Sequence, residues 1–479
     1  MGKWNAAHPA IALLFAACAM MFSEVSAQNA TFTTQQYPLL GNNHVAADFN
    51  GDGRLDLAGA GSNTVSVMLN NGTGAFGPKT DFAIAAQTQA VAAGDFNGDG
   101  KTDLVVTLND PQSSFALLTG TGTGSFNAPV YFPNTSGFDS PAVIATDLNN
   151  DGKLDLVILH SIGCFIAPCS TAHSITVLLG NGNGTFQAAQ EIDVGLVPHA
   201  MAVGDFNRNG IQDLAIGGEN TQLRILLGVG DGTFAAQPIM QLVPGGDIFS
   251  ACNDVDVADF NGDGIQDLVV PLGNGRGNAI LIGNGNGTFQ VTQRITVNET
   301  FAPLNLAVAD YNRDGFADIA RAMGDGTNGL IEILHGNGNG TFQPQVSYLV
   351  PPPQSSIGGI FITSSDFNGD GKPDIALEVG GASPALNVLI NSTATAGDTV
   401  SITRAEYRTS NRTLRVEATS TRADATFQVF VTSSGQLIGT LANNGGGRFR
   451  GQFSWPVNPR NITVRSNFGG QATRTVTVR

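Results

Sequence analysis

Hydrophobic and polar residues follow one another in short runs along most of the chain, and the runs recur with a long period. Apolar stretches such as "VDVADF" lead into an acidic segment, and stretches such as "DLVV" leave it. A third apolar run such as "ITVLL", a Gly-rich turn such as "GNGNGT" and a fourth run that begins with Phe follow. Four short runs separated by tight turns predict four antiparallel β-strands in each repeat.

The repeat occurs seven times. Its acidic segment starts 47 to 58 residues after the previous one, at Asp48, Asp95, Asp147, Asp205, Asp259, Asp310 and Asp366. Four strands in a repeat of this length are typical of a propeller blade. We therefore expect an all-β fold in which residues 28–397 form a seven-bladed β-propeller.

The two ends of the repeat region complement each other. The seventh repeat stops after its third predicted strand, residues 386–391, whereas residues 31–40 have the pattern of a fourth strand without predecessors. We expect this N-terminal strand to close the last blade, because an unpaired sheet edge at the seam would be prone to aggregation.

Residues 398–479 differ from the repeats in pattern and in charge. Polar and apolar residues alternate, as in "TFQVFV", which predicts a small β-sandwich, Ig-like domain. This segment contains 11 Arg, no Lys and four acidic residues, so its formal charge is +7 against −23 for residues 1–397. A solvated face, docking against the acidic propeller or an anionic cell-surface polysaccharide would each account for the Arg residues. Nucleic acid is not expected as a partner, because the segment lacks an array of aromatic residues for stacking.

The first 27 residues have the pattern of a signal peptide. Lys3 precedes an apolar stretch that ends near "VSA", a small-residue cleavage pattern, while Cys18 leaves lipidation as an alternative. We expect an exported protein, secreted, periplasmic or at the cell surface, without an integral membrane segment after cleavage. Cys164 and Cys169 are close enough in sequence to form a disulfide, and Cys252 is expected to be a small buried residue.

Oxygen donors recur at fixed positions of each acidic loop, the ten-residue segment that begins at the Asp residues named above. Position 1 is Asp, position 3 is Asn, position 5 is Asp except for Asn209, position 6 is Gly and position 9 is Asp. Calcium is coordinated by six to eight such oxygens, and Gly permits the tight turn around the ion. Position 7 shares no side-chain chemistry, so a main-chain carbonyl is expected to bind there. An EF-hand is excluded, because position 12 is never Glu.

Up to seven calcium ions are therefore predicted as cofactors. The predicted ligands are Asp48, Asn50, Asp52, Asp56, Asp95, Asn97, Asp99, Asp103, Asp147, Asn149, Asp151, Asp155, Asp205, Asn207, Asn209, Asp213, Asp259, Asn261, Asp263, Asp267, Asp310, Asn312, Asp314, Asp318, Asp366, Asn368, Asp370 and Asp374. The site with Asn209 should bind calcium most weakly, because it has one carboxylate fewer.

These loops resemble those of the FG-GAP or VCBS repeats, best known from the propellers of integrin α chains. The resemblance covers residues 28 to about 397. It implies calcium in the hairpin between the first and second strands of each blade, on one face of the disc. Some fungal lectins with integrin-like loops are also similar, which favours an adhesion or lectin-like module for a glycan or protein surface.

A partner is expected on the face opposite the calcium loops, where the connections vary most in length. The candidate segments are 160–174, 242–254 and 349–358, and His44 and His199 are candidates to line the central opening. An extracellular polysaccharide-modifying enzyme, a lyase or hydrolase, is the alternative. The chain has no H-E-x-x-H or G-x-S-x-G motif, so no catalytic residue is predicted.

Overall fold

A computed structural model gives the fold of most of the chain. It describes residues 30–133, 139–161, 173–244, 251–273, 275–297, 305–324, 329–350, 360–379, 385–393, 399–421, 425–432, 436–466 and 471–479. These residues form 37 strands and contain no helix. The predicted signal peptide, residues 1–27, and both Cys164 and Cys169 lie outside the described residues.

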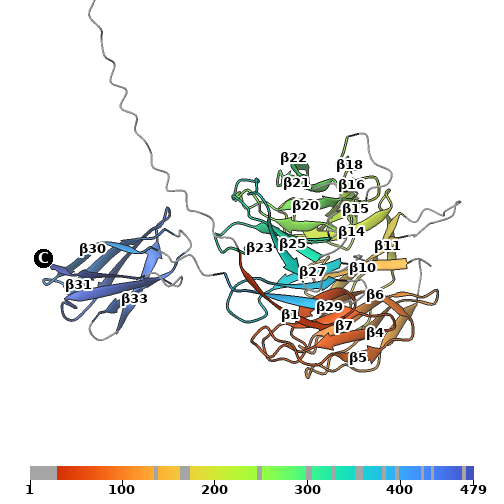
Figure 1. The fold of residues 1–479 in the computed structure, drawn as a ribbon, viewed down its shortest axis with the longest axis horizontal. Helices are drawn as coiled ribbons and strands as arrows, with labels where there is room; N and C mark the ends of the chain where they lie inside the picture. The colour runs from red at the N-terminus through yellow and green to blue at the C-terminus, as the bar shows by residue number, and fades with distance from the viewer. Residues whose placement is uncertain are drawn as a thin grey trace, which may run out of the picture.

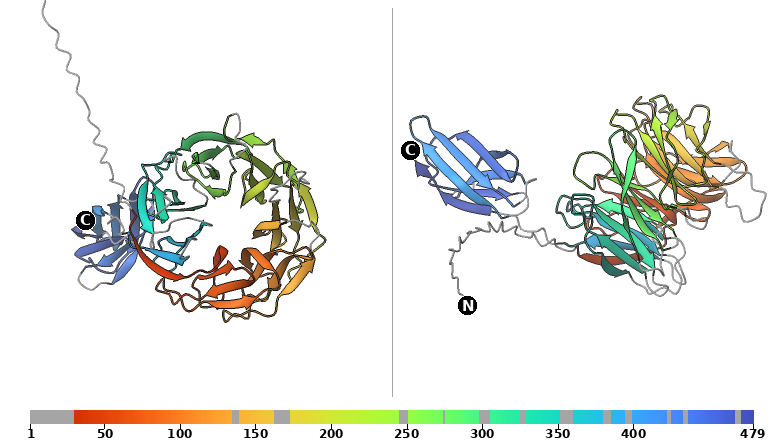
Figure 2. Two further views of the ribbon diagram at one scale, coloured as in Figure 1. Left: turned by 45° about the vertical axis from the view of Figure 1, so that its right-hand side comes forward. Right: turned by 90° about the horizontal axis from the view of Figure 1, so that it is seen from above.

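Seven antiparallel sheets form a ring, as predicted (Figure 2). The first four blades consist of β2 (Asn42–Ala47), β3 (Asp56–Ala60), β4 (Thr64–Met68) and β5 (Thr80–Ala83); β6 (Gln87–Gly94), β7 (Asp103–Asn109), β8 (Ser113–Leu118) and β9 (Val130–Pro133); β10 (Asp139–Thr146), β11 (Asp155–Ser161), β12 (Ser174–Leu178) and β13 (Gln190–Asp193); and β14 (Pro198–Gly204), β15 (Asp213–Gly218), β16 (Gln222–Gly228) and β17 (Phe234–Ala236), with β18 (Met240–Gln241) also paired to β16.

The last three blades complete the ring. They consist of β19 (Asp256–Ala258), β20 (Asp267–Leu272), β21 (Gly277–Gly283) and β22 (Phe289–Ile295); β23 (Leu306–Ala309), β24 (Asp318–Gly324), β25 (Gly329–Leu334) and β26 (Val346–Val350); and β27 (Ile360–Ser365), β28 (Asp374–Val379), β29 (Ala385–Asn391) and β1 (Phe32–Pro38).

The N-terminal strand closes the seventh blade, which confirms the prediction (Figure 1). β1 pairs antiparallel with β29 in a register that runs from Phe32 opposite Asn391 to Pro38 opposite Ala385. Beyond the strand, the backbone N–H of Ser392 donates to the carbonyl of Thr31 at 2.7 Å. Every blade of the ring therefore has at least four strands, and the seam is closed by the pairing of β1 with β29.

Neighbouring blades share an aromatic core. Position 2 of each acidic loop is buried. Except for Leu148 in the third loop, it is aromatic, and its ring packs on the Phe that begins the fourth strand segment of the next blade, as in Phe49 with Phe126, whose ring centroids are 5.8 Å apart. The carbonyl of Phe49 also accepts a hydrogen bond from the N–H of Gly124, in the Gly-rich turn of that next blade. Acidic loops and Gly-rich turns therefore lie on the same side of the disc.

Glu378, on β28, holds the chain where it passes from β1 to β2. The side chain is buried, and its Oε1 accepts hydrogen bonds from the N–H groups of Leu40 at 2.7 Å and Gly41 at 2.8 Å. Burial raises the pKa of Glu378 from 4.5 to about 7, against the lowering effect of these two hydrogen bonds.

Because the folded state binds this proton more tightly than the unfolded state, the stability that Glu378 contributes is full below pH 4.5 and is lost as the pH rises to about 7. We expect Glu378→Gln, which keeps one acceptor oxygen and cannot ionise, to gain on the order of 3 kcal/mol over wild type between about pH 4 and about pH 8. Urea unfolding of both proteins at the two pH values measures this change. The prediction would be contradicted if the free energies of unfolding of the variant and of wild type differed by the same amount at both pH values.

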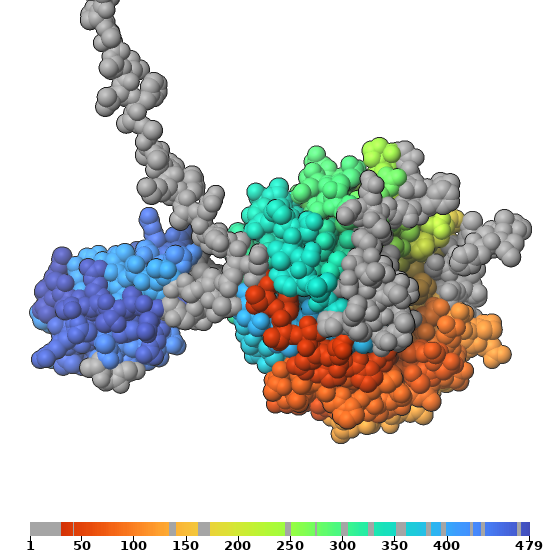
Figure 3. Space-filling view, in the orientation of Figure 1, coloured from red at the N-terminus to blue at the C-terminus, as the bar shows by residue number. Residues whose placement is uncertain are grey.

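The C-terminal residues form a separate set of eight strands with its own core, compatible with the predicted β-sandwich (Figure 3). Their order in the sheet is β36-β35-β32-β33-β34-β31-β30-β37. The strands are β30 (Ser401–Arg408), β31 (Thr413–Thr419), β32 (Phe427–Val431), β33 (Leu437–Asn443), β34 (Arg448–Ser454), β35 (Asn461–Ser466), β36 (Gln471–Thr475) and β37 (Thr477–Val478). Within the described part of the chain, no helix has the length and apolar character that crossing a membrane requires.

Candidate functional site

Each acidic loop connects the first and second strands of its blade, and its side chains bend back onto its own backbone. In the second blade, Asp95 Oδ2 accepts a hydrogen bond from the N–H of Gly100 at 2.8 Å, and Oδ1 accepts from Asp99 at 3.2 Å. Asn97 Oδ1 also accepts from the N–H of Asp99, at 2.9 Å, and Asp99 Oδ1 accepts from Lys101 at 3.0 Å. The side-chain oxygens of positions 1, 3 and 5 are thus all held against one turn of the chain.

The same turn is present in all seven loops. Position 1 accepts from the N–H of the position-6 Gly at 2.7 to 2.8 Å in every blade. Each of these glycines has a φ between 77° and 92°, a left-handed conformation that a side chain would strain. The residues are Gly53, Gly100, Gly152, Gly210, Gly264, Gly315 and Gly371.

The carboxylates of a loop lie close enough to repel one another. Burial raises the pKa of Asp56 to about 6, and the charges of Asp52 and Asp48 raise it further, against two backbone hydrogen bonds. In the sixth blade, burial likewise raises the pKa of Asp310 to about 6, and the charges of Asp318 and Asp314 add to the shift. A set of hard oxygen donors under mutual repulsion suits a hard divalent cation, so the residues present fit calcium.

Asn and the main chain are essential to this fit. Among the described residues, no three His, Cys, Asp or Glu side chains form a group that could hold a metal ion. A cation in these loops would therefore depend on the position-3 Asn and on main-chain carbonyls as well as on carboxylates.

Position 9 has a structural task that the sequence analysis missed. Its carboxylate is fully buried in every blade. One oxygen accepts from the N–H of position 2 at 2.9 to 3.1 Å. The other accepts from an N–H at the end of the third strand at 2.7 to 2.8 Å. The position-9 Asp thus clasps the acidic loop to the Gly-rich turn, and only the remaining lone pairs of its oxygens are free for a metal.

Position 7 also supplies a counter-ion in some loops, which its varied side chains did not indicate. In four loops its cation pairs with the position-5 carboxylate, as in Lys101 Nζ, which lies 3.1 Å from Asp99 Oδ2. The other pairs are Arg54 with Asp52, Lys153 with Asp151 and Lys372 with Asp370. These pairs lie at the protein surface, where water screens the charges, so each contributes little to stability. The blades with Ile211, Ile265 and Phe316 at position 7 have no such internal counter-ion.

The sixth blade carries a further departure. His335 Nδ1 lies 3.1 Å from Asp318 Oδ2, and both side chains are fully buried. His335 ends the third strand segment, where the other blades place other residue types, so nothing in the loop pattern pointed to it.

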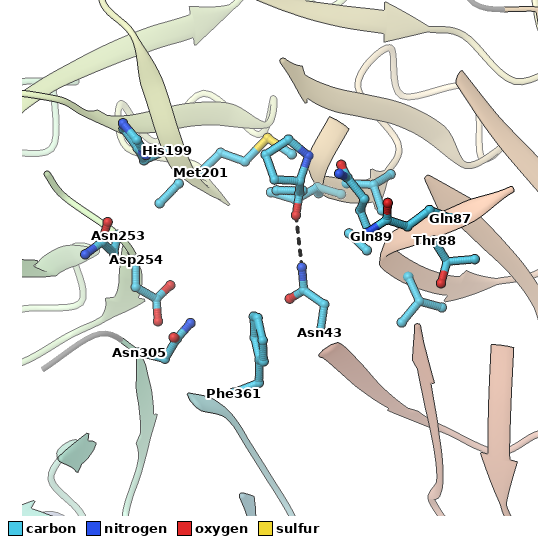
Figure 4. Close-up of a pocket in the computed structure, with 17 residues that line it drawn as sticks. Asn43, Gln87, Thr88, Gln89, His199, Met201, Asn253, Asp254, Asn305 and Phe361 are labelled. Atoms are coloured by element: carbon cyan, nitrogen blue, oxygen red, sulfur yellow. Dashed lines mark hydrogen bonds between the residues drawn. The ribbon is translucent and has the colours of Figure 1, made fainter. Parts of the chain in front are cut away.

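A cavity of about 600 Å³ lies on the axis of the ring (Figure 4). All seven blades contribute residues from the start of their first strands, among them Asn43, Gln89, Pro141, His199, Asp254, Asn305 and Phe361. Because each first strand ends at its acidic loop, the cavity lies at the opposite end of these strands. Figure 4 places Asn253, Asp254 and Asn305 on one side and Gln87, Thr88 and Gln89 on the other.

The cavity is polar. Asp254 Oδ2 accepts from the N–H of Leu306 at 2.7 Å and Oδ1 from that of Val255 at 2.9 Å, and burial raises the pKa of Asp254 to about 6. Burial also lowers the pKa of His199, against the raising effect of Glu219, whose Oε1 lies 3.6 Å from His199 Nε2. Burial thus disfavours the charged form of both Asp254 and His199.

Only part of the predicted partner region falls on described residues. Residues 162–172, 245–250 and 351–359 lie outside the described part of the chain. Of segment 242–254, Asn253 and Asp254 line the cavity. His199 also lines it, as predicted, whereas His44 is not among the lining residues and its Nε2 lies 3.2 Å from the carbonyl of Ala376. Cys252 is fully buried, as expected.

Comparison with known proteins supports the fold. No curated protein matches the chain in sequence. The crystal structure of BBS1N in complex with ARL6DN shares 13% identity over 75% of this chain and 96% of its own, with a TM-score of 0.50. A lectin from Agrocybe aegerita, described as recognising non-reducing terminal N-acetylglucosamine, shares 21% identity over 64% of this chain and 80% of its own, with a TM-score of 0.48.

The family comparison is more specific. The model of the FG-GAP-like repeat matches residues 48–106, 95–158, 205–270, 271–321 and 322–377. The matched segments contain all seven acidic loops in full, and together they span more than half of the chain. The chain belongs to the FG-GAP-like repeat family.

Proposed function

We propose that this protein is an exported, calcium-stabilised binding module that holds a carbohydrate in its axial cavity. The observation that carries the proposal is that cavity, to which every blade contributes, on the face opposite the acidic loops. Its volume of about 600 Å³ falls within the ~300–1,000 Å³ of ordinary ligand pockets.

The lining suits a polyhydroxylated ligand. The amide side chains of Asn43, Gln89, Asn253 and Asn305 each offer a donor and an acceptor, which match sugar hydroxyl groups. The carboxylate of Asp254 adds an acceptor, and Phe361 adds an apolar surface for the C–H face of a sugar ring. Such a lining favours a neutral glycan over a strongly charged ligand.

Calcium has a structural role in this proposal. The acidic loops lie at the far end of the strands that line the cavity, so the ions would brace the first strands without touching the ligand. At a free calcium concentration ten times the dissociation constant, each occupied site would stabilise the fold by about 1.4 kcal/mol. Extracellular calcium modules typically have dissociation constants of about 0.1 to 1 mM, which suits an exported protein.

A glycan array tests the ligand class, and the best-retained glycan then serves in titration calorimetry. We expect Asn305→Ala to weaken binding of that glycan about tenfold, because a partly buried amide that would bond sugar hydroxyl groups is lost. Asn127→Ala, which removes an exposed Asn from a Gly-rich turn, is the matched control and should bind like wild type.

Two outcomes would contradict the proposal. Equal affinity of wild type and Asn305→Ala would exclude the axial cavity as the site. Release of shortened or unsaturated sugar products would identify the protein as a polysaccharide-modifying enzyme instead of a binding module.

A further inference from the structure

One face of the C-terminal domain is strongly cationic. On β34, Phe449 is buried in the domain core whereas Arg448 and Arg450 are exposed, and on β31 Val416 is buried whereas Arg415 is exposed. Successive residues of a strand point to opposite faces, so these three Arg side chains share the outward face. The charge excess of residues 398–479 is therefore gathered in part on one sheet surface.

Strand register fixes how the three Arg residues are spaced. Arg450 pairs with Glu417 on β31, and Arg415 lies two residues from Glu417 on the same strand. The diagonal between Arg450 and Arg415, and the step from Arg448 to Arg450, are each about 7 Å. The three guanidinium groups form a triangle that a single extended polymer can reach.

These three side chains have no internal partner in the described part of the chain, unlike Arg404 and Arg479 on the same face. Arg404 pairs with Glu417 at 3.2 Å and with Glu406 at 3.0 Å, and Arg479 pairs with Glu406 at 2.9 Å. Among the described residues, no ion pair or side-chain hydrogen bond involves the guanidinium groups of Arg415, Arg448 or Arg450. The acidic side chains of the face are thus already neutralised, while three cations remain available.

A groove of about 700 Å³ runs beside two of these cations. Arg448 and Arg450 line it together with Thr403, Thr419, Asn444 and Glu417. The carboxylate of Glu417 is already paired with Arg404. The guanidinium groups can bond a carboxylate or sulfate in a bidentate manner, and the hydroxyl and amide groups can bond sugar hydroxyls. The groove therefore offers both kinds of contact that an anionic sugar requires.

We propose that this groove and the adjoining Arg415 form a second binding site, for an anionic polysaccharide that carries carboxylate or sulfate groups. Charge complementarity selects a polyanion. Single-stranded nucleic acid is disfavoured, because the outward residues of β34 are Arg448, Arg450, Gln452 and Ser454 and provide no aromatic ring for base stacking.

Binding of the full-length protein to immobilised hyaluronate, chondroitin sulfate and neutral dextran tests the proposal. We expect wild type to bind one or both of the charged polymers in low salt and to release them in high salt. It should not bind dextran. The double variant Arg448→Gln/Arg450→Gln should bind about tenfold more weakly, and the single variant Arg415→Gln about threefold more weakly.

The matched control removes the same charge from the opposite side of the domain. Arg460 and Arg465 are exposed residues at β35, outside the groove, and Arg460→Gln/Arg465→Gln should lose less than about twofold in affinity. If both double variants lost the same affinity, the binding would depend on the net charge of the domain and not on the groove, and the proposal would be overturned.

Three further results would also overturn it. One is the absence of binding to either charged polymer. Another is tighter binding of a short DNA duplex than of the polysaccharides. The third is that sedimentation shows salt-sensitive self-association, which Arg448→Gln/Arg450→Gln abolishes, while no polysaccharide binds. The cationic face would then dock on the acidic propeller of another copy. The thermal midpoint of each variant establishes that it is folded, and Arg415→Gln keeps the test decisive should the double variant unfold.

Discussion

Chelating calcium is expected to lower the thermal midpoint of the propeller by about 10 °C or more, because up to seven sites at about 1.4 kcal/mol each would be lost. The charges of Asp48 and Asp52 raise the pKa of Asp56, and position 7 carries no cation in the loops of the fourth, fifth and sixth blades. Differential scanning calorimetry in excess calcium and in excess EGTA measures the shift. Melting at the same temperature in both would contradict the calcium proposal.

A single-loop variant separates this effect from a general response to salt. Asp263→Asn in the fifth blade removes one carboxylate from a loop that has Ile265 in place of a Lys at position 7. We expect it to reduce the calcium-induced gain by about one site's share and to leave the midpoint in EGTA unchanged. Magnesium at the same concentration should restore less of the gain than calcium, because it retains its waters and requires octahedral geometry.

Replacing a position-9 Asp is expected to destabilise the protein whether or not calcium is present. Asp103→Ala would leave the N–H groups of Phe96 and Gly120 without their present acceptors, which lie at 3.1 and 2.7 Å. Two buried donors left unsatisfied cost about 2–5 kcal/mol in total. Urea unfolding in EGTA and in calcium should give a loss of this size in both.

Position 5 of the same loop is the matched control. Asp99 is not enclosed as Asp103 is, and its carboxylate pairs with Lys101 at the surface. We expect Asp99→Ala to be as stable as wild type in EGTA and to differ from wild type only in a smaller stability gain from calcium. If Asp103→Ala had the same free energy of unfolding as wild type in EGTA, the two hydrogen bonds of Asp103 would not stabilise the fold. Position 9 would then act only through calcium.

Much of the fold was predictable because it depends on local signals that repeat. The alternation of apolar runs and turns gave the seven blades, and the incomplete seventh repeat gave the pairing of β1 with β29. The position-6 glycines and the buried aromatic residue at position 2 follow from the loop's own geometry. Such local patterns can be recognised in the sequence even when the residues on the neighbouring strands are unknown.

The parts that escaped prediction depend on contacts between distant segments. The clasp of Asp103 joins it to Gly120, a residue of another turn whose position only the folded blade defines. The axial cavity gathers one strand start from each blade, so no stretch of sequence displays it. His44 and His199 occupy similar places in their repeats, yet only His199 lines the cavity, because the ring of His44 bonds the neighbouring seventh blade at Ala376.

The pairing of β1 with β29 also constrains the order of events during synthesis. Phe32 emerges early, but its partner Asn391 is made more than three hundred residues later. Until then the first blade has no finished neighbour on that side, and its inner apolar surface stays accessible to solvent or to a chaperone. Closure is therefore the last step of ring formation, and a chain shortened before β29 cannot complete the disc, however well its earlier blades are built.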